Sequence, residues 1–233
     1  KVPFGRENLL SSSELVFQER SIGSNHIGPG RELGLLGAGE FSGVSVQFGL
    51  FNGNGSIVGD DNDGLLYAGR LDYTLGNAED TVSTYGEVDG VVASVGANAY
   101  FDQGTATNTL AYGGDFLLRV SALSVLAEVN MANIGPSDSS VDVPEVFADT
   151  TRLGGVVQLG YSIGAFEPAI RAEIYDDDRG VEDNGDVLKA VAGLTGHFNE
   201  DRVRAGLAYV HRQELAGQNV ANDTVRVFFQ MKY

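Results

Sequence analysis

The sequence contains no cysteine and only three histidines among its 233 residues. The absence of cysteine excludes a disulfide framework, a thiol nucleophile and thiolate metal sites. Long hydrophobic runs are also absent, since no stretch approaches the roughly 18 uninterrupted apolar residues that a membrane-spanning helix needs. If the chain spans a membrane, it must do so as a closed β-barrel, because open sheet edges are not tolerated in hydrocarbon.

Positive charge is scarce. The chain has 15 Lys and Arg against 32 Asp and Glu, which gives a formal net charge of −17. Nucleic-acid binding requires clustered Lys and Arg that neutralise phosphates, and here the few cations are spread along the sequence. We therefore exclude a nucleic acid as a partner.

Apolar residues recur at every second position in segments of about ten residues, which is the period of a β-strand with one apolar face. In the last segment, Val225, Val227 and Phe229 alternate with polar residues such as Arg226 and Gln230. The segments lie near residues 1–5, 31–41, 43–51, 64–76, 88–101, 109–121, 122–133, 150–164, 166–175, 187–198, 203–212 and 223–233. The pattern thus predicts about twelve antiparallel strands.

Alternation is common to β-sandwiches and membrane barrels, and the links between the segments distinguish the two. Turns near Ser42, Ser121, Ala165 and Asn199 are very short. The alternate links, near 52–63, 134–149, 176–186 and 213–222, are longer and polar, and 77–87 is a longer link among the short ones. Short turns at one end and long loops at the other are typical of outer-membrane barrels. The sequence predicts a single-domain, all-β, transmembrane antiparallel up-and-down barrel over 1–233, with the long links outside the cell.

The N-terminal region carries a more specific pattern. Lys1-Val2-Pro3-Phe4-Gly5-Arg6 is followed by Glu19-Arg20-Ser21 and by Gly28-Pro29-Gly30-Arg31. Residues 1–41 resemble the middle of a phosphate-selective porin of the O and P type. The aromatic end at Tyr233 resembles the C-terminal assembly signal of outer-membrane proteins. The resemblance implies a 16-stranded homotrimeric barrel, further strands upstream of Lys1, and a segment at 7–30 that folds inward and narrows the pore; covering the outer end is the alternative.

Charged residues of the predicted strands fall on the face opposite the apolar one. A Lys or Arg facing lipid at mid-membrane costs about 2–4 kcal/mol, so these side chains should point into the lumen. The predicted pore-lining residues are Arg70, Arg119, Arg152, Arg171, Lys189, Arg204, Arg212 and Arg226. Water-exposed arginines would attract anions, whereas arginines paired with inward acids would only brace the wall. The resemblance implies small anions such as phosphate as solutes, although the chain has only three lysines.

No catalytic, cofactor-binding or metal-binding constellation stands out. The three histidines fall in a loop, on the luminal face and on the lipid face, so we do not expect an enzyme. The acidic run 176–186 contains oxygen ligands that calcium favours, but it lacks the spacing of an EF-hand, and a hydrated acidic surface is the simpler interpretation. Acidic outer loops could also meet the divalent ions that bridge lipopolysaccharide. We expect a passive porin of a Gram-negative outer membrane; the alternative is a structural or partner-binding barrel without an open pore.

The face assignment makes a testable prediction. Leu159→Arg or Leu207→Arg should impair barrel assembly, because each substitution places a charge in hydrocarbon at a cost of about 2–4 kcal/mol. The measurement is the yield of heat-modifiable barrel in membranes, with Leu159→Ala and Leu207→Ala as uncharged controls. Wild-type yield from both arginine variants would show that these faces are assigned the wrong way round.

Overall fold

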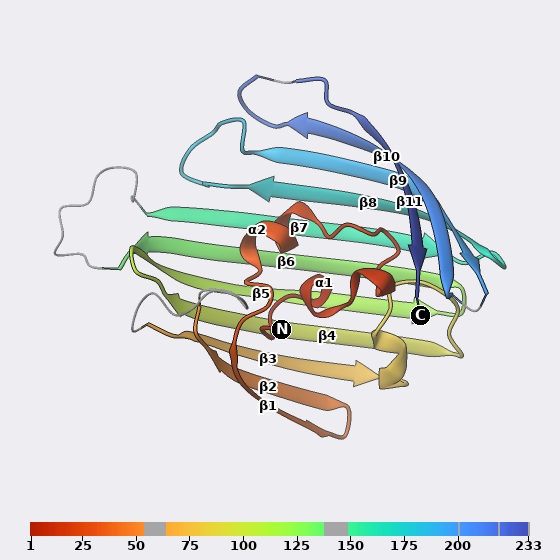
Figure 1. The fold of residues 1–233 in the computed structure, drawn as a ribbon, viewed down its shortest axis with the longest axis horizontal. Helices are drawn as coiled ribbons and strands as arrows, with labels where there is room; N and C mark the ends of the chain where they lie inside the picture. The colour runs from red at the N-terminus through yellow and green to blue at the C-terminus, as the bar shows by residue number, and fades with distance from the viewer. Residues whose placement is uncertain (54–63, 138–148, 200, 219, 233) are drawn as a thin grey trace.

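A computed structural model describes residues 1–53, 64–137, 149–199, 201–218 and 220–232 of the chain. Within these described residues, eleven strands form one sheet in which every strand pairs antiparallel with the next in sequence. The strands are β1 (Gly34–Phe41), β2 (Val44–Phe51), β3 (Leu66–Leu75), β4 (Val91–Gln103), β5 (Thr107–Val120), β6 (Leu123–Pro136), β7 (Thr150–Tyr161), β8 (Phe166–Asp176), β9 (Val187–Phe198), β10 (Val203–Glu214) and β11 (Thr224–Met231). Figure 1 shows the sheet as one curved layer.

The predicted all-β, antiparallel, up-and-down order is confirmed. The sheet is not closed: β1 and β11 are its two edges, and no pairing joins them in the described part of the chain. Tyr233, which resembles an assembly signal, lies outside the described residues, as do most of the links 52–63 and 134–149. Barrel closure and the total strand number therefore remain predictions.

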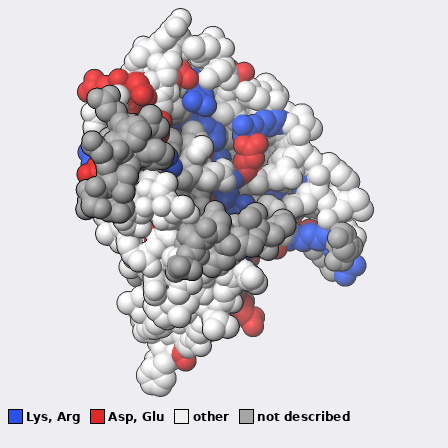
Figure 2. All heavy atoms as spheres, turned by 60° about the vertical axis from the view of Figure 1, so that its left-hand side comes forward, with Lys and Arg blue, Asp and Glu red and all other residues white. Residues whose placement is uncertain are grey.

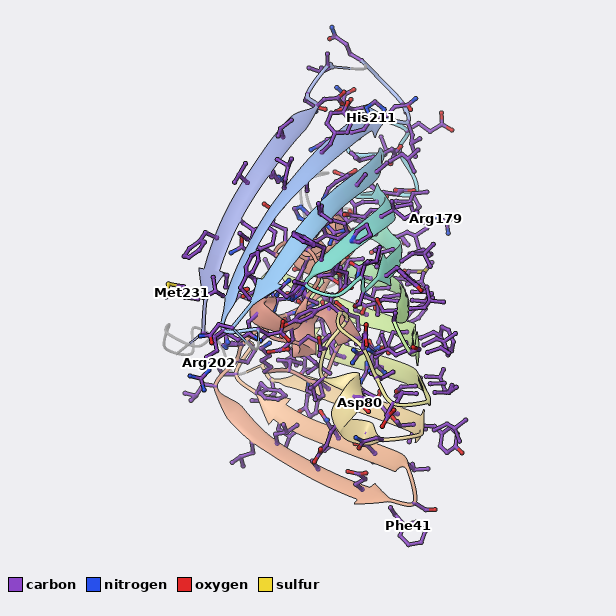
Figure 3. All side chains as sticks on the ribbon, turned by 90° about the vertical axis from the view of Figure 1, so that its right-hand side faces the viewer. Phe41, Asp80, Arg179, Arg202, His211 and Met231 are labelled. Carbon is purple, nitrogen blue, oxygen red and sulfur yellow. The ribbon has the colours of Figure 1, made fainter. Side chains whose placement is uncertain are left out.

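The predicted strand at residues 1–5 is wrong. These residues begin a segment of irregular backbone and short helices that continues to β1: α1 (Arg6–Leu9), the 3₁₀ turn η1 (Ser12–Glu14) and α2 (Ile22–Ile27). We call residues 1–33 the N-terminal segment. Alternation over five residues is too short to distinguish a strand from a segment whose apolar residues are buried for other reasons. Figures 1 and 3 show this segment lying against the concave face of the sheet.

The short turns lie at the end of the sheet where the sequence predicts them. Their backbone conformation explains how so few residues can join two strands. Ser42 and Gly43 join β1 to β2 with φ angles of 51° and 80°. Two successive positive φ angles are typical of a type I′ turn, whose twist matches that of the flanking strands. The exception at 77–87 is present too, because the link from β3 to β4 includes a 3₁₀ turn, η2 (Ala78–Thr81), at the short-turn end.

The two faces of the sheet carry opposite chemistry. On the convex face, large apolar side chains are exposed: Leu71, Val95, Val157, Ile170 and Leu207 each leave 51–55% of their surface uncovered. On the concave face the buried side chains include many charged ones, while the apolar contacts come from two clusters. One contains Val2, Phe4 and Ile27 of the N-terminal segment, and the other contains Val16, Phe17 and Tyr85. Apolar residues of the N-terminal segment thus fill much of the concavity. Among the described residues, no helix is long and apolar enough to cross a membrane.

Glycine permits the closest approach between the N-terminal segment and the sheet. A Cβ added to Gly154 of β7 would lie 2.5 Å from the Cα of Gly23 in α2. Both atoms belong to backbone, so neither side can yield without moving a whole element. The contact between Gly23 and Gly154 therefore sets the distance between α2 and the sheet.

Gly154→Val should displace α2 and weaken docking of the N-terminal segment, with an overpacking cost of about 1–3 kcal/mol. The measurement is the rate of tryptic cleavage at Arg20 in the folded protein. Gly69→Val in β3 is the matched control, because an added Cβ there meets nothing closer than the Gln47 carbonyl oxygen at 3.8 Å. Equal protection of Arg20 in both variants would contradict the role of this contact.

Candidate functional site on the concave face

All eight predicted pore-lining cations occupy concave-face positions, as the strand register and their partners show. They divide into two groups by exposure. Arg70, Arg119, Arg171, Lys189 and Arg204 are between 1% and 6% exposed. Arg152, Arg212 and Arg226 are partly exposed. Of the two alternatives open from the sequence, the first group matches arginines that brace the wall, because neighbouring acids, the N-terminal segment and the β3–β4 link bury these side chains.

Arg70 belongs to a compact cluster of two arginines and two aspartates. Its Nη1 donates to Asp115 Oδ2 at 2.6 Å and its Nε to Asp72 Oδ2 at 2.7 Å. Arg6 of α1 enters the same cluster, where Nε donates to Asp115 Oδ1 at 2.7 Å and Nη2 to Ser94 Oγ at 2.8 Å. Gly96 leaves the room for this, because an added Cβ would lie 2.3 Å from Arg70 Nη2. The formal charges of these two arginines and two aspartates sum to zero.

The carboxylates of the cluster continue in one row across the sheet. Successive cross-strand partners connect Asp72 to Gly96, Asp115, Glu128, Val156 and finally Glu173. The four acids among them, Asp72, Asp115, Glu128 and Glu173, therefore form one row that runs across the strands. We call these four residues the carboxylate row. Buried carboxylates require charged or hydrogen-bonding partners, because an unpaired buried charge is very unfavourable.

Donors of the N-terminal segment reach all four members of the row, because Arg6 Nη2 also donates to Asp72 Oδ1 at 3.3 Å. Arg6 contacts Asp115, the backbone N–H of Glu7 donates to Glu128 Oε2 at 3.0 Å, and the backbone N–H of Ile22 donates to Glu173 Oε2 at 2.8 Å. Ser24 Oγ adds a second donor to Glu128 at 3.0 Å. The row therefore serves as the docking line for the N-terminal segment.

Arg171 and Lys189 compensate the acids at the far end of the row. Arg171 Nε lies 2.7 Å from Glu173 Oε1, and Lys189 Nζ lies 2.9 Å from the same oxygen. Arg171 Nη1 donates to the Glu19 carbonyl at 2.7 Å and lies 3.8 Å from Glu7 Oε1. Arg171 and Lys189 therefore each bind a carboxylate, and Arg171 also binds the N-terminal segment.

A second docking point lies at the short-turn end, where the β3–β4 link folds into the concavity. Arg119 donates to the carbonyls of Asp80 and Gly86 at 2.7 and 3.0 Å, which holds the link against the sheet. The link in turn binds the N-terminal segment, since Thr84 N–H donates to the Glu14 carbonyl at 2.9 Å. The unexpectedly long link is therefore a support for the N-terminal segment.

Tyr85 is the centre of this second docking point. Its hydroxyl donates to the Ser13 carbonyl at 2.9 Å and accepts from Lys232 Nζ at 3.0 Å. Burial raises the pKa of the Tyr85 phenol, which keeps it a neutral donor. The Arg204 guanidinium lies 4.1 Å from the ring centroid and donates to the Leu15 carbonyl at 2.8 Å.

Two of the partly exposed cations, Arg212 and Arg226, have carboxylate partners closer to solvent. Arg212 Nε lies 3.4 Å from Glu214 Oε1, and Arg226 pairs with Glu19 of the N-terminal segment. Figure 2 shows a hollow in which both basic and acidic side chains are visible. A pocket of about 350 Å³ lies between α1, the β3–β4 link and strands β1–β4. Its polar lining includes Arg6, Glu40, Ser45, Gln47, Arg70, Asp72, Thr74 and Ser94.

The three histidines lie apart, as expected. His26 stacks on Tyr175, His197 pairs with Asp201 at the short-turn end, and His211 pairs with Asp223 on the convex side. Among the residues that the structure describes, no group of three or more His, Cys, Asp or Glu side chains forms a metal-binding arrangement. The predictions of no enzymatic activity and no cofactor stay predictions.

No protein-family model matches the chain, and a comparison with curated proteins finds no match either. The resemblance to phosphate-selective porins therefore rests on the residues of the chain alone.

Arg6 and Glu7 were not recognised from the sequence as members of the charged face. The predicted strand ends at residue 5 and the predicted inward segment begins at residue 7, whereas the structure places Arg6 and Glu7 against strands far along the chain. A signal was present, because the charged residues opposite the apolar face of the predicted strands also include the acids Asp72, Asp115 and Glu128, and a buried row of acids requires donors from elsewhere.

Arg6→Gln should reduce the free energy of unfolding by about 1.5–3 kcal/mol, which is typical of lost hydrogen bonds to charged groups. Denaturant titration measures this, and a double-mutant cycle with Asp115→Asn should give a non-zero coupling energy. Arg202→Gln, at an exposed arginine of the β9–β10 turn, is the control and should change stability by less than about 0.5 kcal/mol. Additive effects of Arg6→Gln and Asp115→Asn would argue against their contact.

Proposed function

We propose that the chain forms most of the wall of an outer-membrane β-barrel channel through which small solutes diffuse passively. The distribution of exposure along single strands carries this proposal. Ile170 and Leu207 are 55% and 54% exposed, whereas Arg171 is 3% exposed and Arg204 1%. A sheet bathed in water on its convex face would favour the reverse, because exposed contiguous apolar surface is unfavourable there. Hydrocarbon around the convex face and a polar lumen account for both faces together.

The unpaired edges of the sheet support closure by further strands between β11 and β1. Backbone N–H and C=O groups without partners cannot face lipid, so β1 and β11 require neighbours. The resemblance of residues 1–41 to phosphate-selective porins suggests 16 strands and a homotrimer. The alternation of short and long links supports an orientation in a Gram-negative outer membrane with the long links outside, near lipopolysaccharide.

The proposed solutes are small anions, of which phosphate is the one that the resemblance favours. Among the predicted pore-lining residues, Arg152, Arg212 and Arg226 remain partly exposed and can act on a solute directly. The buried cations contribute less, because nearby carboxylates compensate Arg70, Arg171 and Lys189. We therefore expect a modest anion preference, set by the partly exposed arginines.

A closed barrel with a structural or partner-binding role is the second candidate. The observation that favours it is the packed cluster of Val16, Phe17, Tyr85, Val191 and Val210, which fills the concavity over β8–β10. If the remaining space is also filled when the barrel closes, no water path crosses it.

Planar-bilayer recording of the purified, folded full-length protein separates the two candidates. The channel proposal predicts stepwise conductance and a reversal potential of anion-selective sign across a salt gradient. Arg212→Gln together with Arg226→Gln should shift that potential toward cations, because fixed charge in a narrow lumen sets the ion concentration there.

Arg202→Gln removes one positive charge from the exposed β9–β10 turn and should leave the potential unchanged, since exposed charges are screened within about 8 Å at physiological salt. No conductance from well-folded protein would favour the closed barrel. Conductance with the same selectivity in all variants would support the channel but show that Arg212 and Arg226 do not determine its selectivity.

A further inference from the structure

The acidic link from β8 to β9 brings two carboxyl groups together at its base. Asp176 is the last residue of β8, and Asp186 directly precedes β9. The final cross-strand pair of these strands joins Tyr175 to Val187, so the two aspartates leave the sheet side by side. Continued by one residue, this register places Asp176 opposite Asp186. Figure 2, which brings the long-link end forward, shows acidic side chains gathered at this rim.

Asp186 is unlike the other acids of the link because it is buried. It is 8% exposed, and its Oδ1 is hidden from solvent without a hydrogen-bond partner. Its Oδ2 accepts only a long bond, 3.4 Å, from the Asp183 N–H. The Oδ1 of Asp176 is equally hidden and also has no partner. Two oxygens that belong to facing carboxylates are thus shielded from water.

The described residues supply little positive charge to this pair. Arg179 Nε lies 4.0 Å from Asp176 Oδ2, and the Arg179 side chain is 52% exposed. An ion pair at that distance and exposure contributes little. Two adjacent carboxylates repel each other, so either a proton or a cation must lie between them for the arrangement to be stable.

We propose that Asp176 and Asp186 bind a divalent cation, calcium in preference to magnesium. Carboxylate oxygens are hard ligands, and calcium accepts six to eight oxygens in irregular geometry, whereas magnesium demands a near-ideal octahedron. The two aspartates supply the protein charge, and the remaining ligands would be backbone carbonyls and water, since the described residues hold no group of three or more acidic, His or Cys ligands. The cation ties the end of β8 to the start of β9.

A site with two carboxylates should be weak. We expect a dissociation constant in the range of about 10⁻⁴–10⁻³ M, which is typical of extracellular calcium modules. The Asp183 and Glu182 side chains are exposed and can only add to the general attraction of the link for cations. The proposal concerns cation binding alone and holds whether or not the barrel conducts.

Isothermal titration of the folded full-length protein with calcium chloride tests the site, and magnesium chloride provides the comparison. The wild type should bind one calcium ion per chain at this link. Asp176→Asn and Asp186→Asn should each weaken binding at least about tenfold, because each removes one of the two charged ligands. Glu182→Gln is the matched control, since it removes one charge from the same link without touching the pair.

Far-ultraviolet circular dichroism of each variant shows that the barrel has folded, and asparagine keeps the shape of the aspartate. Equal weakening by all three substitutions would overturn the proposal in favour of a diffuse acidic surface. It would also be overturned if the wild type bound no calcium at millimolar concentration, since a shared proton would then stabilise the pair.

Discussion

The burial of charge on the concave face is the constraint on which the rest of the structure depends. Strands β3–β9 turn apolar side chains to the convex face, and strict alternation therefore turns their polar side chains inward. Carboxylates in that position are costly unless donors reach them. The N-terminal segment supplies donors at Asp115, Glu128 and Glu173. Its course through the concavity follows from this need for partners as well as from its own apolar residues.

The two docking points hold different parts of the N-terminal segment by different contacts. Along the carboxylate row, polar contacts fix α1 and α2, and the backbone contact of Gly23 with Gly154 sets their distance from the sheet. At the short-turn end, the β3–β4 link and Arg204 enclose residues 13–17 in a largely apolar cluster. A segment held at two separated points is more restricted than one held at either alone. This arrangement suits a fixed lining of the proposed lumen better than a free plug.

The buried arginines illustrate why charge on a lumen face does not translate directly into selectivity. Arg70 belongs to a cluster with zero formal charge, and Arg119 donates to three carbonyls of the β3–β4 link. Both brace the structure, which was one of the two roles open from the sequence. Only cations that keep contact with water, such as Arg212 and Arg226, can act strongly on a passing solute.

The sequence by itself determined the sheet. The period-two alternation and the turn residues, such as Ser42-Gly43, are local properties, so the antiparallel order, the two faces and the ends of most strands could be read from it. Tertiary structure decided what covers the inner face. Arg6 and Asp115 are far apart in the sequence, and no local pattern reports contacts between residues at that separation. The burial of Arg204 and the placement of residues 1–33 depend in the same way on the curvature of the whole sheet.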